Sequence, residues 1–230
     1  MTDYAAALLA GSELDPARRR QVAERLAHYT GLPVDYVLKA DLRVNVGEFQ
    51  RTLKDAQGLS IGRLDSRFEG PQFDPMSKEA DYDPQSAAIS SAYVAAFNDY
   101  ARRTLKFGGE RAFRPSFDVD KDWSYLHQPP GSGQPIPAIG NVMPDLATAM
   151  KLNPRLRVLV TGGRYDLATP YFEGLYEMRH LQIPANLRSN IDYRYYPSGH
   201  MVYANEASLK ALHDDVADFI RRNASAQAGQ

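Results

Sequence analysis

The most constraining feature of this sequence is a pair of short apolar runs, each ending at a polar loop and followed by a helical pattern. The first run is Val158-Leu159-Val160, which ends at Gly162-Gly163, and the second is the stretch IDYRYY at residues 191–196. β-Branched and aromatic runs of this length are typical of strands. Apolar residues recur at helical spacing after each run, namely Phe172, Leu175, Tyr176 and Leu181 after Pro170, then Leu209, Leu212, Val216, Phe219 and Ile220. With a short helix at about 145–152 in front, this predicts a β-α-β-α unit with two neighbouring parallel strands.

The first half of the chain predicts helices instead of strands. Asp15-Pro16 is a typical helix start and Gly31 a typical helix end. A second helix is expected from about Gly47 to Gly58, and a third from Asp83-Pro84 to Gly108-Gly109. The third carries an apolar stripe made of Ile89, Tyr93, Phe97 and Tyr100. Since each helix has a narrow apolar face, we expect these faces to pack against other parts of the protein.

A loop rich in proline and glycine, PPGSGQP at residues 129–135, interrupts the two patterns. We therefore expect two parts, a mainly helical segment at 1–128 and a strand-helix-strand-helix segment at 136–225. The predicted fold class is α/β.

Charge and composition exclude several kinds of partner. The 230 residues carry 27 lysines and arginines against 28 acidic residues, without a long run of one sign, so neither nucleic acid nor a membrane is an expected partner. The absence of cysteine excludes disulfides and thiolate metal sites. The N-terminal stretch lacks the basic flank and long apolar run of a signal peptide or membrane span, so the chain as written is expected in the cytoplasm.

The stretch Gly58-Leu59-Ser60-Ile61-Gly62 matches the G-x-S-x-G pattern of a hydrolase nucleophile. That pattern needs a buried strand before it and a helix after it, because the sharp turn between them exposes the serine. Here a polar helix end precedes the motif and a charged stretch follows it. We instead expect a short, half-exposed strand with the Ser60 hydroxyl directed away from the apolar face, and no catalytic role for Ser60.

Asp166 and His200 are the candidate site residues. Asp166 lies just beyond the carboxyl end of the first predicted strand, and His200 just beyond the end of the second. Ligands and catalytic groups of open α/β sheets lie in such loops. Parallel strands would bring the two side chains together, and an aspartate can orient a histidine that acts as a general base. The alternative is that both are ordinary loop residues; the other histidines have no such placement.

No cofactor or metal site is predicted. The stretch Asp118-Val119-Asp120-Lys121-Asp122 begins like a calcium loop, but Trp123 stands where the turn glycine belongs and Pro129 where the bidentate glutamate belongs. Phosphate loops, zinc-helix motifs and dinucleotide fingerprints are absent from the sequence.

Two stretches resemble the end of bacterial serine carboxypeptidases of the S10 peptidase family, which are α/β-hydrolases with a helical insertion. These are VLVTGGRYDLATP at 158–170 and YYPSGHMVY at 195–203. Softer similarity extends over nearly the whole chain, at 29–32, 42–44, 62–67, 95–100 and 140–142. The resemblance implies an incomplete α/β-hydrolase, in which 1–128 belongs to the insertion, or cap, and 136–225 supplies the last two parallel strands and their helices.

The resemblance also implies that Asp166 and His200 are the aspartate and histidine of a catalytic triad. The family's nucleophile lies in a Gly-Glu-Ser-Tyr-Gly elbow that this sequence lacks, and Met1 is expected to fall inside the family's sequence. The expected function is therefore that of a carboxypeptidase portion, inactive alone, whose partners are the missing N-terminal half and peptide C-termini. Proteins of this family are often secreted or periplasmic, which leaves the localisation open. The alternative is a non-catalytic binding module or remnant of the hydrolase fold.

Overall fold

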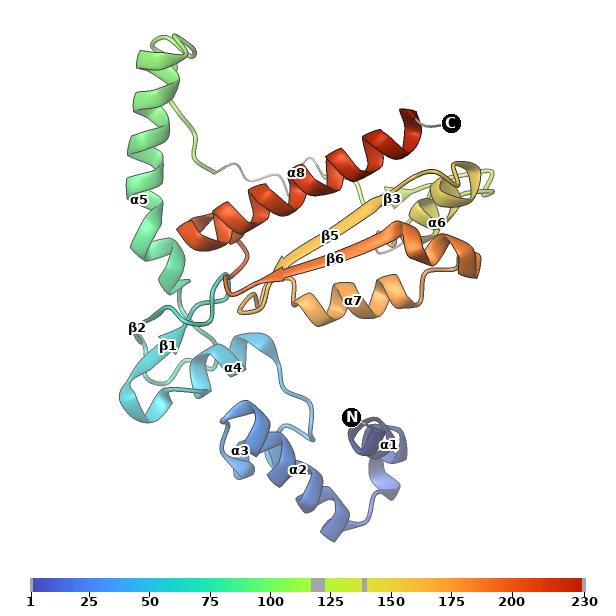
Figure 1. Cartoon of the computed structure of the whole chain (residues 1–230). Helices are drawn as coiled ribbons and strands as arrows, with labels where there is room; N and C mark the ends of the chain where they lie inside the picture. Colours follow the sequence, from blue (N-terminus) through green and yellow to red (C-terminus); the bar gives the residue numbers. More distant parts are fainter. Residues whose placement is uncertain (1, 117–122, 138–139, 229–230) are drawn as a thin grey trace. The chain divides into compact units, whose positions relative to one another are not determined.

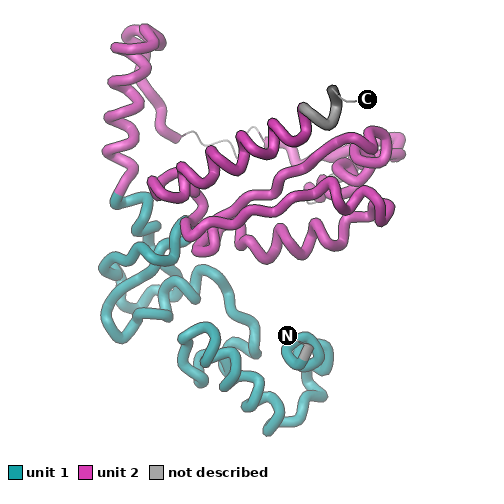
Figure 2. The backbone as a smooth tube through the Cα atoms, in the orientation of Figure 1, with its two compact units in different colours: residues 1–88 teal, residues 89–230 magenta. Residues whose placement is uncertain are grey.

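The computed structural model describes residues 2–116, 123–137 and 140–228 (Figure 1). The chain is of the mixed α/β class, with many helices and a few short strands. It divides into two compact units, residues 1–88 and 89–230 (Figure 2). The sequence placed a boundary in the loop at 129–135, whereas the division observed here falls inside a helix.

The first unit is a group of short helices with one small hairpin. Its helices are α1 (Thr2–Ala10), α2 (Pro16–Thr30), α3 (Val34–Lys39) and α4 (Val46–Thr52), with 3-10 turns at Gly11–Glu13 and Asp55–Gln57. A core of apolar side chains joins α1, α2 and α3, and its buried members are Ala7, Val22, Ala23, Leu32, Val37 and Leu42.

The predicted ends of α2 are confirmed. Asp15 caps the helix by accepting a hydrogen bond from the Arg18 backbone N–H at 3.0 Å, and Gly31 ends it in the left-handed conformation with φ 78°. The second predicted helix is shorter than expected. It ends at Thr52, and Gly58 instead closes the 3-10 turn with φ 67°.

Ser60 lies in a hairpin of strands β1 (Leu59–Ile61) and β2 (Glu69–Pro71), which are antiparallel, with Ser60 opposite Gly70. The short strand at this position is confirmed. The expectation of a half-exposed strand is wrong, because Ser60 is only 1% exposed and its hydroxyl is buried without a hydrogen-bond partner among the described residues. The reason is that Ile61 beside it is buried too, so both faces of this strand end are covered.

Helix α5 (Pro84–Asp99) crosses from the first unit into the second and continues as a π-helical turn at Tyr100–Thr104. Its predicted stripe does not pack as expected: Tyr93, Phe97 and Tyr100 are each about half exposed. Among the described residues, this face of α5 therefore stays largely open to solvent.

The proline- and glycine-rich loop at 129–135 turns a minimal hairpin. Strand β3 (Leu126–His127) pairs antiparallel with β4 (Ile136–Pro137), one on each side of the loop. Proline and glycine thus occupy the turn, as their backbone preferences predict, and both arms belong to the second unit.

The predicted β-α-β-α unit is present in the second unit. It consists of helix α6 (Met143–Leu152), strand β5 (Val158–Gly163), helix α7 (Tyr171–Arg179), a 3-10 turn (Ala185–Asn190), strand β6 (Ile191–Tyr196), a short turn (Val202–Ala204) and helix α8 (Glu206–Ala228). Strands β5 and β6 are parallel neighbours, and their register runs from Val158 opposite Ile191 to Gly163 opposite Tyr196. Both predictions, the parallel pairing and the strand positions, are confirmed.

Alternate residues of β6 contact different helices, as the pleat of a strand requires. Ile191 and Tyr193 belong to an apolar core with residues of α6 and α7, including Ala147, Met150 and Met178. On the other face, Asp192 and Arg194 pair with Arg222 and Asp215 of α8. Figure 1 shows α7 and α8 on opposite sides of the two strands.

Helix α8 is only partly covered. The sequence predicted one apolar face, but Leu209, Val216 and Ile220 are exposed while Leu212 and Phe219 are half-buried. The apolar face is therefore wider than the surface that two strands offer it.

Candidate functional site

The loops that follow β5 and β6 are joined backbone to backbone. The Arg164 N–H donates to the Tyr196 carbonyl at 3.0 Å, and the Tyr165 N–H donates to the Ser198 carbonyl at 3.0 Å. At Gly163 a Cβ atom would lie 2.1 Å from the Gly199 carbonyl oxygen and 2.3 Å from that of Ser198. Glycine is thus required at 163 because the second loop passes directly over it.

This approach brings the two predicted residues together. His200 Nδ1 lies 2.9 Å from Asp166 Oδ2. The Asp166 side chain is 4% exposed, whereas the imidazole is 43% exposed. The arrangement is a buried carboxylate behind an imidazole that reaches the surface.

Among the described residues, the hydrogen bonds that hold the Asp166 carboxylate come from its own loop and from His200. Oδ1 accepts from the backbone N–H groups of Ala168 at 2.7 Å and Thr169 at 3.0 Å. Oδ2 accepts from the Thr169 hydroxyl at 2.8 Å. A buried carboxylate with this many donors is fixed in position and satisfied.

Thr169 is a site residue that the sequence reading missed. Besides donating to Asp166, its Oγ1 lies 3.2 Å from His200 Nδ1. The His200 Nδ1–H can therefore donate a shared hydrogen bond, to the Asp166 carboxylate and to the Thr169 oxygen. The signal in the sequence is the spacing Asp-x-x-Thr, which is typical of an aspartate that caps the turn it begins.

The chemistry open to this pair is that of an oriented general base. With its Nδ1–H directed at Asp166, a neutral imidazole keeps the proton off Nε2, which is then free to take a proton. The negative carboxylate stabilises the imidazolium that results. Ser198, the serine closest to His200 in the sequence, is buried, and its hydroxyl contacts the Val202 carbonyl oxygen at 3.2 Å.

Ser60 does not have the surroundings of a nucleophile. A 3-10 turn precedes its strand, and the chain returns through β2 instead of entering a helix. The strand-to-helix elbow that exposes a catalytic serine is therefore absent at GLSIG.

A second histidine-carboxylate pair joins the β3–β4 hairpin to α6. His127 Nε2 lies 3.1 Å from Asp145 Oδ2, a contact for which the sequence offered no signal. Here the burial is reversed, with the imidazole 21% exposed and the carboxylate 41% exposed. The His127 imidazole is half as exposed as that of His200, so it offers less surface to a substrate and serves to link the hairpin to α6.

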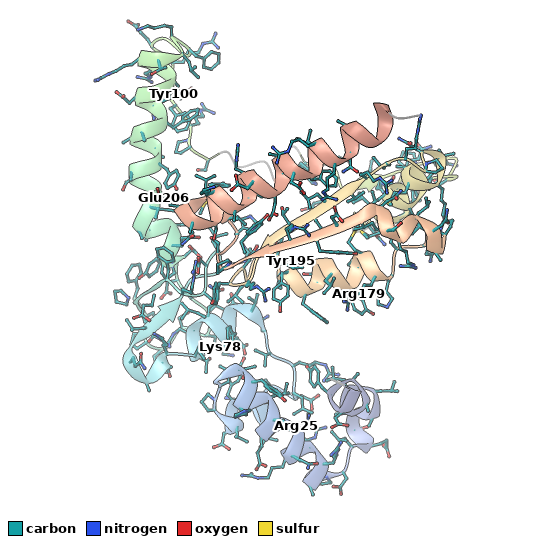
Figure 3. All side chains as sticks on the ribbon, in the orientation of Figure 1. Arg25, Lys78, Tyr100, Arg179, Tyr195 and Glu206 are labelled. Atoms are coloured by element: carbon teal, nitrogen blue, oxygen red, sulfur yellow. The ribbon has the colours of Figure 1, made fainter. Side chains whose placement is uncertain are left out.

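Aromatic side chains flank the β6 end of the site. Tyr195 packs against Tyr171 with ring centroids 5.1 Å apart, and Figure 3 labels Tyr195 on β6. Burial raises the pKa of Tyr195, whose hydroxyl has no hydrogen-bond partner among the described residues. Burial, together with a hydrogen bond to Asp215, raises the pKa of Tyr196. Both phenols therefore stay neutral well above neutral pH.

No group of three or more histidine or acidic side chains in the described ranges is arranged to hold a metal ion. The calcium-like stretch at 118–122 lies outside the described residues. Within the described part of the chain, no helix is long and apolar enough to cross a membrane. Comparisons with protein-family models, curated proteins and solved structures found no match for this chain.

Proposed function

We propose that this chain is the C-terminal portion of a serine carboxypeptidase of the S10 family, an incomplete α/β-hydrolase. In this proposal the helical segment 1–128 is the cap, and 136–225 supplies the last two strands. The observation that carries the proposal is the 2.9 Å contact between His200 Nδ1 and the buried Asp166 carboxylate, at the carboxyl ends of two parallel strands. Two parallel strands with polar loops at their carboxyl ends support the proposal, because catalytic groups of open α/β sheets lie in such loops.

The proposed reaction needs a nucleophile from outside this sequence. A serine supplied by the missing N-terminal half attacks the last peptide bond of a substrate, and His200 Nε2 accepts the serine proton. The imidazolium, held by Asp166, then protonates the leaving amine as the acyl-enzyme forms. Water hydrolyses the acyl-enzyme by the same proton transfers in reverse order. Alone, the chain has a base without a hydroxyl to activate.

The test compares the chain with a version extended by the in-frame segment encoded directly upstream of Met1. Release of the last residue from an N-blocked dipeptide is measured for both. We expect turnover only from the extended protein. His200→Ala and Asp166→Asn should each lower its kcat by roughly 10⁴-fold, because the base is lost or held in the wrong tautomer.

Ser60→Ala is the matched control. Its hydroxyl is buried and makes no hydrogen bond in the described structure, so its removal should leave both folding and turnover unchanged. Turnover by the unextended chain that disappears with Ser60→Ala would contradict the proposal. An upstream region without a Gly-Glu-Ser-Tyr-Gly elbow would contradict it as well.

The second candidate is a non-catalytic binding module or remnant of the fold, and the absence of a Gly-Glu-Ser-Tyr-Gly elbow from this sequence favours it. The sequence's one match to the nucleophile pattern lies in an antiparallel hairpin with its serine buried. For such a module, the extended protein would show no turnover, and the chain alone would be a stable monomer.

A further inference from the structure

The end of α5 carries a pocket that lies apart in the sequence from Asp166 and His200 and to which the proposed function assigns no role. Its walls come from the last turns of α5 and from the segment 107–114, which folds back along them. The Phe107 N–H donates to the Ala101 carbonyl at 2.9 Å, and the Arg111 N–H to the Gly108 carbonyl at 3.0 Å. Gly108 and Gly109, with φ 86° and 50°, make the tight turn possible. We call this cavity of about 580 Å³ the α5-tip pocket; Figure 3 labels Tyr100, which begins the turn after α5.

Aromatic rings form the apolar part of the α5-tip pocket. Phe97, Phe107 and Phe113 all line it, and the rings of Phe97 and Phe113 lie 5.1 Å apart between centroids. These two rings meet at the cavity while 52% of Phe97 and 39% of Phe113 stay exposed, so a ligand in the pocket would cover apolar ring surface that is otherwise open to solvent. The volume lies within the range of pockets that hold small molecules.

Three arginines add positive charge to the walls, whose other members are small or neutral residues. Arg102, Arg111 and Arg114 line the pocket, and no acidic side chain among the described residues pairs with any of them. Arg102 instead donates to the Arg111 carbonyl at 2.8 Å, which fixes one guanidinium beside the rings. The stretch 97–114 holds five lysines and arginines against two acids, in a chain with a formal net charge of −1. The pocket is therefore a local basic site in a nearly neutral protein.

We propose that the α5-tip pocket binds a small carboxylate that carries an apolar group. Guanidinium groups bind carboxylates through paired hydrogen bonds, and the phenyl rings cover the apolar part of the same ligand. Two sources share this chemistry, the C-terminal residue of a peptide and a short fatty acid. The peptide source rests on the proposed function, whereas the fatty-acid source does not.

The test is a titration of the whole chain followed by NMR of the backbone amides at 97–114. The probes are N-acetylphenylalanine, laurate below its micelle concentration, and N-acetylphenylalaninamide, which lacks the charge. We expect at least one carboxylate to bind and the amide to bind roughly tenfold more weakly or worse. Tighter binding of N-acetylphenylalanine identifies the peptide source, and tighter binding of laurate the fatty-acid source.

Matched variants separate the pocket from general charge and apolarity. Arg111→Gln and Arg114→Gln should each weaken carboxylate binding several-fold, while Arg103→Gln should not, because Arg103 pairs with Asp99 at 2.8 Å and does not line the pocket. Phe97→Ala should weaken binding, and Leu105→Ala, an exposed residue outside the lining, should not. All five substituted residues are exposed, and of these five only Phe97 contacts another described ring, that of Phe113. The variants should therefore keep the melting temperature of the parent.

Several results would overturn the proposal. They are no binding of either carboxylate, equal binding of the amide, equal losses in the Arg103→Gln control, and binding to phosphatidylserine vesicles without binding to the soluble probes. Each of these binding results is obtained without measuring peptide turnover. A wrong pocket proposal can therefore be distinguished from a wrong proposal for Asp166 and His200.

Discussion

At the scale of single residues, Gly163 determines how closely the two site loops approach. A Cβ at this position would overlap the Ser198 and Gly199 carbonyl oxygens, which belong to a backbone that cannot rotate away as a side chain can. At the neighbouring Gly162, a Cβ would lie 3.6 Å from the Tyr195 ring, an ordinary van der Waals contact. Two adjacent glycines thus differ sharply in what they tolerate.

We therefore expect Gly163→Ala to lower the free energy of unfolding by about 2–3 kcal/mol, the usual cost of forcing extra atoms into a packed site. Gly162→Ala should change it by less than about 0.5 kcal/mol. Urea denaturation of the parent and both variants measures the difference. Equal effects of the two substitutions would show that the loops do not approach as described.

The sequence was sufficient to predict the pair at the site but not the residues that hold it. Asp166 and His200 could be predicted because each follows a recognisable strand, and parallel strands end at the same edge. Thr169 and the steric role of Gly163 depend on how two loops far apart in the sequence meet. Such contacts have no periodicity, so the pattern of a single chain does not reveal them.

At the scale of elements, polar contacts bind α8 to β6. Asp215 accepts from the Tyr196 hydroxyl at 2.9 Å and from Arg194 Nε at 3.2 Å. Tyr196 is buried, and the same hydrogen bond helps to raise its phenol pKa. Next to it, Asp214 is exposed and pairs with Lys210 at 2.6 Å on the outer surface of the helix.

We expect Asp215→Ala to cost about 1–2 kcal/mol of stability, because it leaves a buried hydroxyl without its acceptor. It should also return the Tyr196 pKa toward the ordinary value, which a spectroscopic titration of the phenols detects. Asp214→Ala should leave the unfolding free energy essentially unchanged, since exposed ion pairs contribute little. A larger loss of unfolding free energy for Asp214→Ala than for Asp215→Ala would contradict the placement of Asp215 against β6 and of Asp214 on the outer surface of α8.

The type of each element in the second unit could be predicted, but the surface it covers could not. The periodicity of α8 correctly predicted a helix, yet three of its apolar residues are exposed and charged residues face the sheet. A hydrophobic stripe indicates that something apolar can pack there; it does not indicate how wide the opposing surface is. The open stripe of α5 has the same explanation. The basic α5-tip pocket could not be predicted from composition, because its local positive charge is cancelled in the net charge of the whole chain.

At the scale of the whole molecule, the parallel sheet of the second unit is small for its type. Among the described residues β5 pairs with β6 alone, so each strand has an edge whose backbone groups are unpaired within the sheet. Parallel strands occur almost only in larger sheets that are covered on both faces. Unpaired edges and the exposed row Leu209, Val216 and Ile220 are both surfaces that favour association.

We therefore expect the purified chain to associate as its concentration rises and to bind a hydrophobic dye, as a portion of a larger sheet should. Analytical ultracentrifugation over a wide concentration range and dye fluorescence at matched concentrations measure both effects. Leu209→Lys together with Ile220→Lys should reduce dye binding with little change in the melting temperature, because these residues are 46% and 60% exposed. A monomer at all concentrations that melts in one cooperative step and binds no dye would mean that two strands and three helices suffice for this fold. In that case the non-catalytic module, and not the carboxypeptidase portion, would be the better account of the chain.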